Sequence, residues 1–446
     1  MVYWKSPRNK KQAVSFSDSL AKTLRRYKMN INEILKGFKC SSCQREHKCQ
    51  IESVYIEGGA ISRLSEIAKD YKKILLVADE NTYEAAGAKT EKALKSKIQG
   101  RVIFSGRTIL IPDERAIESV NSKVGDSDLI VGIGSGVIQD LCKYVSFFSR
   151  IPYVIVATAP SMDGYASTGA AMILKGMKET VPAGLPLAIV ADTEVLKNAP
   201  MEMIKAGYGD IIGKYSALND WLLSSVVNDE YLCDYIYKTT FEMIEKTLKT
   251  AKGLLARDEE SVKNLTEALI VVGIMMSFAT TSRPASGSEH HLSHFFEITG
   301  IVKGEPYFPH GIDVAYSTII TAEIRESILN KEFPNKQYCE PKEEYQAKIA
   351  ESYGSVADGC IALQERLGTY KRDRLSIYKA NEAKIREILK MMPSKQEIIE
   401  MLGLVGLDIN EFYKLYGEEK IKRAIRYAKD LKDRYTVLWL NYDVGE

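Results

Sequence analysis

Short apolar runs alternate with helix-like stretches in the first half of this chain. The runs, rich in Val, Ile and Leu, lie at 74–78, 102–104, 129–133, 153–157 and 187–191. Between them, the stretches 61–70, 82–97 and 136–148 have helical spacing of apolar residues. Continuous apolar strands separated by helices are typical of a parallel sheet whose two faces are both covered. Residues 51–192 are therefore expected to form an α/β domain.

The pattern changes after Asp192. Strand-like runs cease, and stretches with helical periodicity follow at 210–227, 231–255, 260–280, 312–330 and 341–367, with three or four more before the end. Pro200 marks another helix start near the boundary. The chain is thus expected to consist of an extension at 1–50, the α/β domain at 51–192 and an all-α domain at 193–446.

Composition narrows the classes of function. The 446 residues are 45% hydrophobic and 27% charged, which is ordinary for a globular enzyme. A formal net charge of +2 argues against nucleic acid or an anionic membrane as the main partner. The N-terminus is basic without the apolar core of a secretory signal, and the longest apolar stretch, 268–279, is shorter than the roughly 20 residues of a membrane span. A cytoplasmic protein with a small-molecule substrate is expected.

Histidine is almost absent from the chain, yet four of its five copies lie between 290 and 310. His290 and His294 are four residues apart and so share one face of a helix, which a Pro-, Gly- and Ser-rich loop introduces. His310 lies in a separate loop beside Pro309. Imidazole is a common ligand for zinc, nickel and ferrous iron, so this clustering predicts a metal site whose third ligand comes from elsewhere.

A glycine-rich turn, Gly132-Ile-Gly134-Ser135-Gly136, joins a predicted strand to the helix that carries Asp140. Glycines let a pyrophosphate approach the backbone, and free N–H groups at a helix start attract it. The spacing departs from G-x-G-x-x-G, and a purely structural turn explains it equally well. At the end of an earlier strand, Asp79 is placed either to bind a ribose or to cap the next helix.

A polar segment, Thr158-Ala-Pro-Ser161-Met-Asp163-Gly-Tyr-Ala-Ser167, follows another predicted strand, at the sheet edge where ligands bind in open α/β folds. Asp163 is a candidate site residue, or alternatively a turn aspartate satisfied by local N–H groups. Asp210 follows a pair of glycines and is expected to open a helix. Its carboxylate is either the missing oxygen ligand or the partner of Lys214 in an i,i+4 ion pair.

Three cysteines and the fifth histidine form a C-x2-C-x3-H-x-C pattern near the N-terminus. It contains Cys40, Cys43, His47 and Cys49. The residue types are those of a zinc knuckle, but the loop between ligand pairs is shorter than usual, and a small exposed hairpin is the alternative. The remaining four cysteines are scattered singly, so no disulfides are expected.

Taken in this order, these segments resemble the superfamily of iron-containing alcohol dehydrogenases, glycerol dehydrogenases and dehydroquinate synthases. The nearest family is that of the sn-glycerol-1-phosphate dehydrogenases. The most specific pieces lie at 158–167, 209–214 and 282–291, and the likeness runs from about residue 54 to 438. The Cys-rich segment also looks like the N-terminal extension of bacterial members. The resemblance implies a Rossmann-like nucleotide-binding domain followed by an all-α metal-binding domain, the dehydroquinate synthase-like fold.

The same resemblance implies a role for individual residues. A divalent metal, zinc or nickel rather than iron, would be bound by Asp210, His290 and His310 in a cleft between the halves. His294 would relay a proton, Asp163 would fix the substrate or the nicotinamide ribose, and Lys214 and Arg283 would be the cations near the substrate phosphate, although salt bridging explains both equally well. NAD(P) would contact Asp79, Gly134, Ser135, Gly136, Asp140, Thr158, Ser161 and Ser167.

The activity implied is the reversible, NAD(P)H-linked reduction of dihydroxyacetone phosphate to sn-glycerol 1-phosphate by a homo-oligomer, with a dimer favoured. A glycerol or other polyol dehydrogenase of the same superfamily is the alternative. A lyase related to dehydroquinate synthase fits less well, because those enzymes carry a Glu ligand with Lys three residues on. This chain has Asp210 with Lys214 four residues on.

Overall fold

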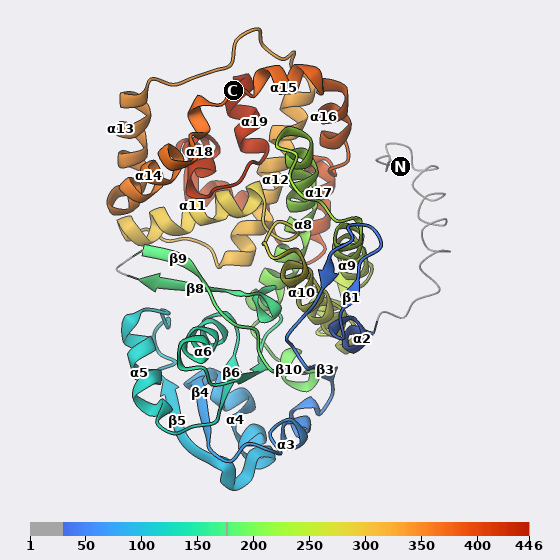
Figure 1. Ribbon diagram of the computed structural model, residues 1–446, viewed down its shortest axis with the longest axis vertical. Helices are drawn as coiled ribbons and strands as arrows, with labels where there is room; N and C mark the ends of the chain where they lie inside the picture. Colours follow the sequence, from blue (N-terminus) through green and yellow to red (C-terminus); the bar gives the residue numbers. More distant parts are fainter. Residues whose placement is uncertain (1–29, 175–176, 446) are drawn as a thin grey trace.

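The computed structural model describes residues 30–174 and 177–445, and its first half is built on a parallel sheet (Figure 1). The six strands lie in the order β3-β10-β7-β6-β4-β5. In chain order they are β3 (Ser53–Glu57), β4 (Ile74–Asp79), β5 (Ile98–Phe104), β6 (Leu129–Gly134), β7 (Tyr153–Ala157) and β10 (Ala188–Asp192). All five neighbouring pairs are parallel, as the apolar runs predict.

Alternate side chains of β4 pack in two separate cores, one on each face of the sheet. In β4, Ile74 and Leu76 pack on one face with residues of α3 (Leu64–Ile67) and α4 (Glu80–Leu94). Leu75 packs on the other face with residues of α5 (Glu114–Val124) and α6 (Gly136–Ser149). Because both faces are covered, the strands carry apolar residues at nearly every position.

Three elements of this half were absent from the sequence prediction: the edge strand β3, helix α5 and an antiparallel hairpin. The hairpin consists of β8 (Gly169–Leu174) and β9 (Met177–Pro182) and lies outside the main sheet. In Figure 1 it lies between the sheet and the helices of the second half. Several of its residues reach the cleft described below, so the missed hairpin belongs to the site.

The second half is helical throughout the described residues after Asp192, as predicted. Its first long helices are α8 (Met201–Val227), α9 (Asp234–Leu255), α10 (Glu259–Ala279), α11 (Ser288–Lys303) and α12 (His310–Leu329). The other helices are α7 (Thr193–Leu196), α13 (Lys342–Tyr353), α14 (Ala357–Leu367), α15 (Leu375–Ala380), α16 (Glu382–Leu389), α17 (Lys395–Gly403), α18 (Ile409–Tyr427) and α19 (Val437–Val444). We propose that the two halves are separate domains divided at Asp192.

Helix α8 begins at Met201, directly after Pro200, so the expectation that Asp210 opens a helix is wrong. Helix α8 continues through Gly207 and Gly209, and the role of these two glycines is close packing against neighbouring segments. A Cβ on Gly207 would lie 1.8 Å from the carbonyl oxygen of Pro160, and one on Gly209 would lie 2.5 Å from that of Gly311. The missing side chains let α8 touch both the loop after β7 and the start of α12. Asp210 is therefore held in mid-helix at the junction of the halves.

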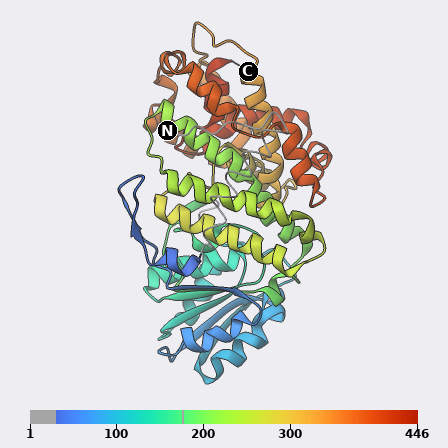
Figure 2. The ribbon, with the colours of Figure 1, turned by 90° about the vertical axis from the view of Figure 1, so that its right-hand side faces the viewer.

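The first described residues form helix α2 (Ile31–Leu35) and the short strands β1 (Phe38–Lys39) and β2 (Glu46–His47). Figure 2 shows this segment along the side of the molecule, beside the long helices. Among the described residues one helix, α10, is long and apolar enough to cross a membrane, but 83% of that stretch is buried inside the protein. Burial of this kind is what the core helix of a folded protein shows.

Candidate active site

The order in which successive strands are added to the sheet reverses at β4. Strand β5 lies on one side of β4, and the next strand, β6, lies on the other side. In open α/β folds, ligands bind outside the carboxyl ends of the strands at such a point. Asp79 ends β4 and Gly134 ends β6. Gly134 has to be glycine, because a Cβ there would lie 2.5 Å from Cβ of Ile138. The free N–H groups of the first turn of α6 come directly after this strand end.

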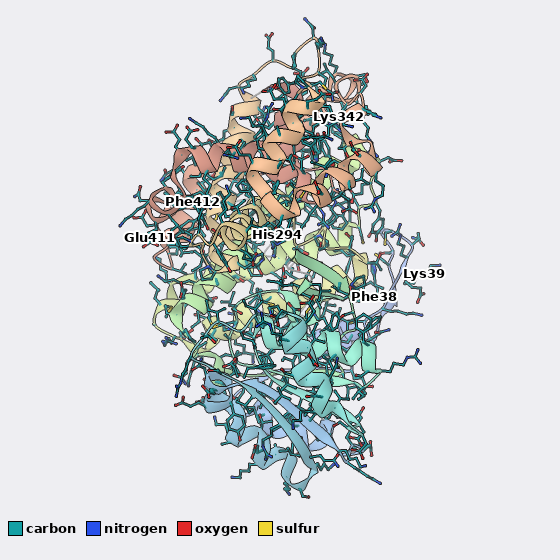
Figure 3. All side chains as sticks on the ribbon, turned by 90° about the vertical axis from the view of Figure 1, so that its left-hand side faces the viewer. Phe38, Lys39, His294, Lys342, Glu411 and Phe412 are labelled. Carbon is teal, nitrogen blue, oxygen red and sulfur yellow. The ribbon has the colours of Figure 1, made fainter. Side chains whose placement is uncertain are left out.

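Two hollows meet at the start of α6. The first, about 350 Å³, is lined by Asp79, Asn81, residues 105–110, Ser135, Val137 and Ile138. The second, about 460 Å³, shares Ser135 and Val137 with the first and extends to Asp163, His294 and His310. Together they form a trough from the end of β4 to the helical half. Figure 3 shows His294 at the waist of the molecule, where the halves meet.

Beneath this second hollow, which we call the cleft, a buried ammonium joins two carboxylates. The Lys214 side chain is fully buried, and its Nζ lies 2.6 Å from Oδ2 of Asp163 and 2.6 Å from Oδ1 of Asp210. The same nitrogen donates to the carbonyl of Ala285 at 3.0 Å. Burial lowers the pKa of Lys214, but the two carboxylates outweigh this and raise it. Lys214 therefore stays charged.

Asp163 is bound to the helical half through its backbone as well. Its N–H donates to Oδ2 of Asp210 at 3.1 Å. Burial raises the pKa of the Asp163 carboxyl, and repulsion from Asp210 adds to this, while Lys214 opposes both. The alternative in which local N–H groups satisfy Asp163 is wrong, since its carboxylate faces Lys214 across the junction of the halves.

His290 presents one ring nitrogen to Asp210. Its Nε2 lies 3.6 Å from Oδ1 of Asp210, while Nδ1 lies 2.7 Å from Oε1 of Glu289. A histidine that donates Nδ1–H to a carboxylate keeps the lone pair of Nε2 free, which is the usual arrangement of metal-bound histidines. Burial, assisted by the charge of Lys214, lowers the pKa of His290 well below its ordinary value. The neutral ring is in the state that can bind a cation.

His310 lies beside His290 and His294, with ring centroids 5.1 and 5.4 Å away. It is the first residue of α12, where the sequence predicted a loop. Ligand atoms of His294, Glu297 and His310 all lie within 4.8 Å of one another, so the structure offers a second possible ligand set that shares His310 with the predicted one. Asp210 and His290 are nearly fully buried, whereas His294 and Glu297 line the open cleft.

The structure brings most of the predicted site residues together. The cleft is lined by Ser135, Gly136, Asp140, Asp163, Ser161, Ser167, His294 and His310 among others. Thr158 is buried and does not line the cleft, and its N–H donates to the carbonyl of Gly134. Asp79 caps α4 in a capping box with Thr82, which confirms the capping role, and it also lines the neighbouring hollow, where its contact with a ribose stays a prediction.

Two predicted phosphate contacts need correction. Lys214 is surrounded by three acceptors and is fully buried, which leaves it no donor for a substrate phosphate. Arg283 does not line the cleft. Its guanidinium binds Glu230 and the carbonyl of Tyr435, and it lines a different pocket of about 320 Å³, with further cations at Arg372, Arg374, Lys432 and Arg434.

Sequence reasoning missed Glu289 and Glu297. Glu289 is fully buried, and burial raises the pKa of its carboxyl to about 7, with repulsion from Asp220 adding to the effect. Glu297 lies one helical turn beyond His294 on α11. The available signal was the spacing 290, 294, 297, which repeats on one face of a helix. Nothing in the sequence singled out Glu289, because glutamate next to histidine is a common pair. Only the structure shows that its side chain is buried and contacts His290.

Comparison with known proteins gives a consistent result. The family model for iron-containing alcohol dehydrogenases matches residues 55–200. A glycerol-1-phosphate dehydrogenase [NAD(P)+] of Geobacillus stearothermophilus is 31% identical over 415 residues, covering 90% of this chain and 95% of that protein. One from Geobacillus thermodenitrificans is 30% identical over 410 residues, covering 89% and 94%.

A solved structure shares the fold at low sequence identity. The iron-containing alcohol dehydrogenase of Thermococcus thioreducens superposes with a TM-score of 0.58 at 15% identity, over 89% of this chain and 99% of that one. The α/β half followed by a helical half is therefore the fold of this group, as predicted.

Replacing Lys214 by Met tests the buried ion network. Two carboxylates would lose their shared cation in a buried site, so the free energy of unfolding of the metal-free protein should fall by about 3–5 kcal/mol. Lys238→Met is the matched control, because Lys238 pairs with Asp234 at the same i,i+4 spacing on the surface, where such a pair contributes at most about 1 kcal/mol. Urea unfolding measures both. Equal losses in the two variants would contradict a special role for Lys214.

Proposed function

This chain belongs to the family of glycerol-1-phosphate dehydrogenases [NAD(P)+], and from this premise we propose how its residues carry out the reaction. The enzyme is an oxidoreductase that reversibly reduces dihydroxyacetone phosphate to sn-glycerol 1-phosphate with NAD(P)H, and it uses a metal. The observation that supports this assignment most strongly is the identity of 31% across 90% of the chain. The trough at the sheet edge, which meets a histidine cluster, is what such a reaction requires.

The dinucleotide lies along the trough in this proposal. The adenosine end occupies the hollow beside Asp79, where the carboxylate accepts hydrogen bonds from the ribose. The pyrophosphate lies over Ser135 and Gly136 at the start of α6, where backbone N–H groups and the helix dipole favour negative charge. The nicotinamide then reaches the cleft between Ser161 and His310.

The metal ligands we propose are Asp210, His290 and His310. The set fits a divalent cation, because it combines one carboxylate with imidazoles, of which His290 is already oriented by Glu289. Such a donor set suits zinc or nickel. When bound, the metal polarises the substrate carbonyl, and NAD(P)H supplies the hydride. Lys214 stays close to Asp210 and fixes the direction of that carboxylate.

His294 is the residue we propose for proton delivery. It lines the cleft on the same face of α11 as His290, with the two ring centroids 6.0 Å apart. An imidazole at this place, directly or through water, gives the proton that the reduced oxygen of the product needs. Asp163, which lines the cleft, is the candidate for positioning the substrate hydroxyl or the nicotinamide ribose.

The substrate phosphate needs cations, and the described residues that line the cleft include no lysine or arginine. We propose Lys432 and Arg434 for this role; both line the neighbouring basic pocket and not the cleft itself. The positive charges of Lys432 and Arg434 contribute to the lowered pKa of His290, so they act on the proposed metal site. Arg434 donates to the carbonyl of Ser286, in the loop that leads into α11.

The activity and the phosphate site are tested together by NADH oxidation. Dihydroxyacetone phosphate should be a far better substrate than dihydroxyacetone, and the product should be sn-glycerol 1-phosphate by chiral analysis. Lys432→Met and Arg434→Met should each raise KM for the phosphorylated substrate about tenfold or more, because a charge-assisted hydrogen bond is lost. Neither should change the rate with dihydroxyacetone. Equal rates of the wild type with both substrates would instead indicate a polyol dehydrogenase.

Replacing His294 by Ala tests the proton relay. Turnover should fall by about 100-fold, as expected for loss of a general acid. Metal content, measured by mass spectrometry of the purified protein, should stay near that of the wild type. Loss of the metal together with activity would make His294 a ligand and favour the set that also contains Glu297.

Replacing Asp79 by Gly tests cofactor choice. A carboxylate beside the ribose repels the extra phosphate of NADPH, so the wild type should prefer NADH. The preference should be modest, about tenfold, because the hollow is open and Asn81 and Thr82 lie beside it. The variant should shift the ratio of kcat/KM values toward NADPH. A wild type that already prefers NADPH, or an unchanged ratio, would leave Asp79 as a helix cap alone.

The setting of the enzyme is also a proposal. We propose a cytoplasmic homodimer that acts on small molecules, in line with the near-neutral charge of the chain and its cleft of about 460 Å³.

A further inference from the structure

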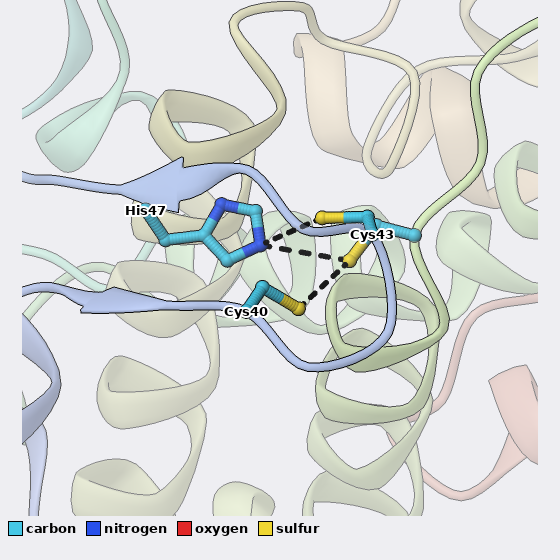
Figure 4. A group of neighbouring side chains, drawn as sticks. Cys40, Cys43 and His47 are labelled. Atoms are coloured by element: carbon cyan, nitrogen blue, oxygen red, sulfur yellow. Dashed lines mark hydrogen bonds between the residues drawn. The ribbon is translucent and has the colours of Figure 1, made fainter.

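A second cluster of metal-ligating side chains lies away from the cleft. Cys40, Cys43 and His47 belong to the hairpin of β1 and β2 (Figure 4). The fourth member is Cys233, the residue that precedes helix α9, nearly two hundred residues along the chain. Cys49, which completes the sequence pattern, is not part of the cluster, so the predicted ligand set of the zinc-knuckle hypothesis is wrong in one member.

The distances within this cluster match a tetrahedron of zinc ligands. Sγ of Cys40 lies 3.7 Å from Sγ of Cys233, and Nε2 of His47 lies 3.6 Å from both Cys43 and Cys233 sulfurs. All four ligand atoms lie within 4.8 Å of one another. Bonds of about 2.3 Å to sulfur and about 2.0–2.1 Å to nitrogen place tetrahedral sulfurs about 3.8 Å apart and sulfur and nitrogen about 3.6 Å apart.

Thiols and an imidazole do not converge in this way for packing alone. S–H groups are weak donors and weak acceptors, so contacts among them contribute little. All seven cysteines are free, which leaves these sulfurs with no covalent partner. His47 is fully buried and stacks on Phe278 at 5.0 Å between ring centroids, which fixes Nε2 toward the sulfurs. Its Nδ1 has no partner among the described residues.

Polar groups around the cluster stabilise the thiolate form of its cysteines. The hydroxyl of Ser42 lies 3.2 Å from Sγ of Cys40 and 3.4 Å from Sγ of Cys233, and the hydroxyl of Tyr231 donates to Cys43 at 3.3 Å. Cys233 stands at the N-terminus of α9, where the helix dipole favours a thiolate. The guanidinium of Arg45 lies 3.5 Å above the ring of Tyr231 and adds a positive charge nearby.

We propose that Cys40, Cys43, His47 and Cys233 bind a structural zinc ion that fastens the N-terminal hairpin to helix α9. Three thiolates and one imidazole fill a tetrahedral site completely and leave no position for a substrate, as in structural zinc centres. None of the four lines the cleft. The ion therefore holds the segment before β3 against the helical half and takes no part in hydride transfer.

The test starts from metal content. Full-length protein produced with ample zinc and purified without chelator should carry two metal ions per chain, one at each site. Cys43→Ser and Cys233→Ser should each lose one zinc equivalent, because a three-ligand remnant binds weakly. Cys49→Ser is the matched control and should keep both. Equal metal content in the wild type and in Cys43→Ser would overturn the proposal, whatever the occupancy of the catalytic site.

A second measurement remains decisive if a variant fails to fold. The measurement is the absorption spectrum of cobalt-substituted wild-type protein. The proposed catalytic ligands include no thiolate, so a sulfur-to-cobalt charge-transfer band can arise only from cobalt bound by Cys40, Cys43 and Cys233. Absence of this band would overturn the proposal.

Intact-mass analysis of protein purified without reductant should give the fully reduced mass. A disulfide between Cys40 and Cys233 would instead identify a redox pair and contradict a zinc site. Folded Cys43→Ser protein should still turn over dihydroxyacetone phosphate, because the ion takes no part in hydride transfer. Its Tm should be lower than that of the wild type, because the hairpin is no longer fastened to α9.

Discussion

The buried ammonium of Lys214 is the interaction on which the catalytic region depends. It lies between a carboxylate from the α/β half, Asp163, and one from the helical half, Asp210. Without a cation the two carboxylates would repel each other in a site with little water, where such repulsion is strong. Asp163 also donates its N–H to Asp210, so the loop after β7 and the middle of α8 are joined by charge and by backbone.

The surrounding packing is consistent with this constraint. Gly207 lets α8 contact the carbonyl of Pro160 directly, and Gly209 does the same for the start of α12, where His310 stands. Asp210 is thus brought next to the histidines of two other helices. Glu289 orients His290 toward the same point. In our proposal the metal completes this arrangement, and the cleft above it receives the nicotinamide from the sheet edge and the substrate from the helical side.

The sequence predicted the parallel sheet well because both faces are buried, so the strands are almost uninterrupted apolar runs. The hairpin β8–β9 was missed because it lies outside that sheet and only its first strand is an apolar run, whereas the second, Met-Lys-Glu-Thr-Val-Pro, is polar in its middle. The histidine cluster was visible because its members are close in the chain and histidine is rare. Burial was not visible, so the sequence left open whether Lys214 and Arg283 contact a phosphate or form salt bridges; the structure surrounds each with acceptors. The sequence could not identify Cys233 as the fourth member of the cysteine cluster, because only the fold brings it next to the hairpin that carries the other three.

The direct test of the account is the position of the metal. Crystals of the zinc-loaded enzyme should give an anomalous difference peak at the zinc edge within bonding distance of Asp210, His290 and His310, with Lys214 still paired to Asp163. A peak bonded instead to His294 and Glu297 together with His310 would contradict the account, because the buried carboxylate of Asp210 would then hold no metal and the ion network would be structural alone.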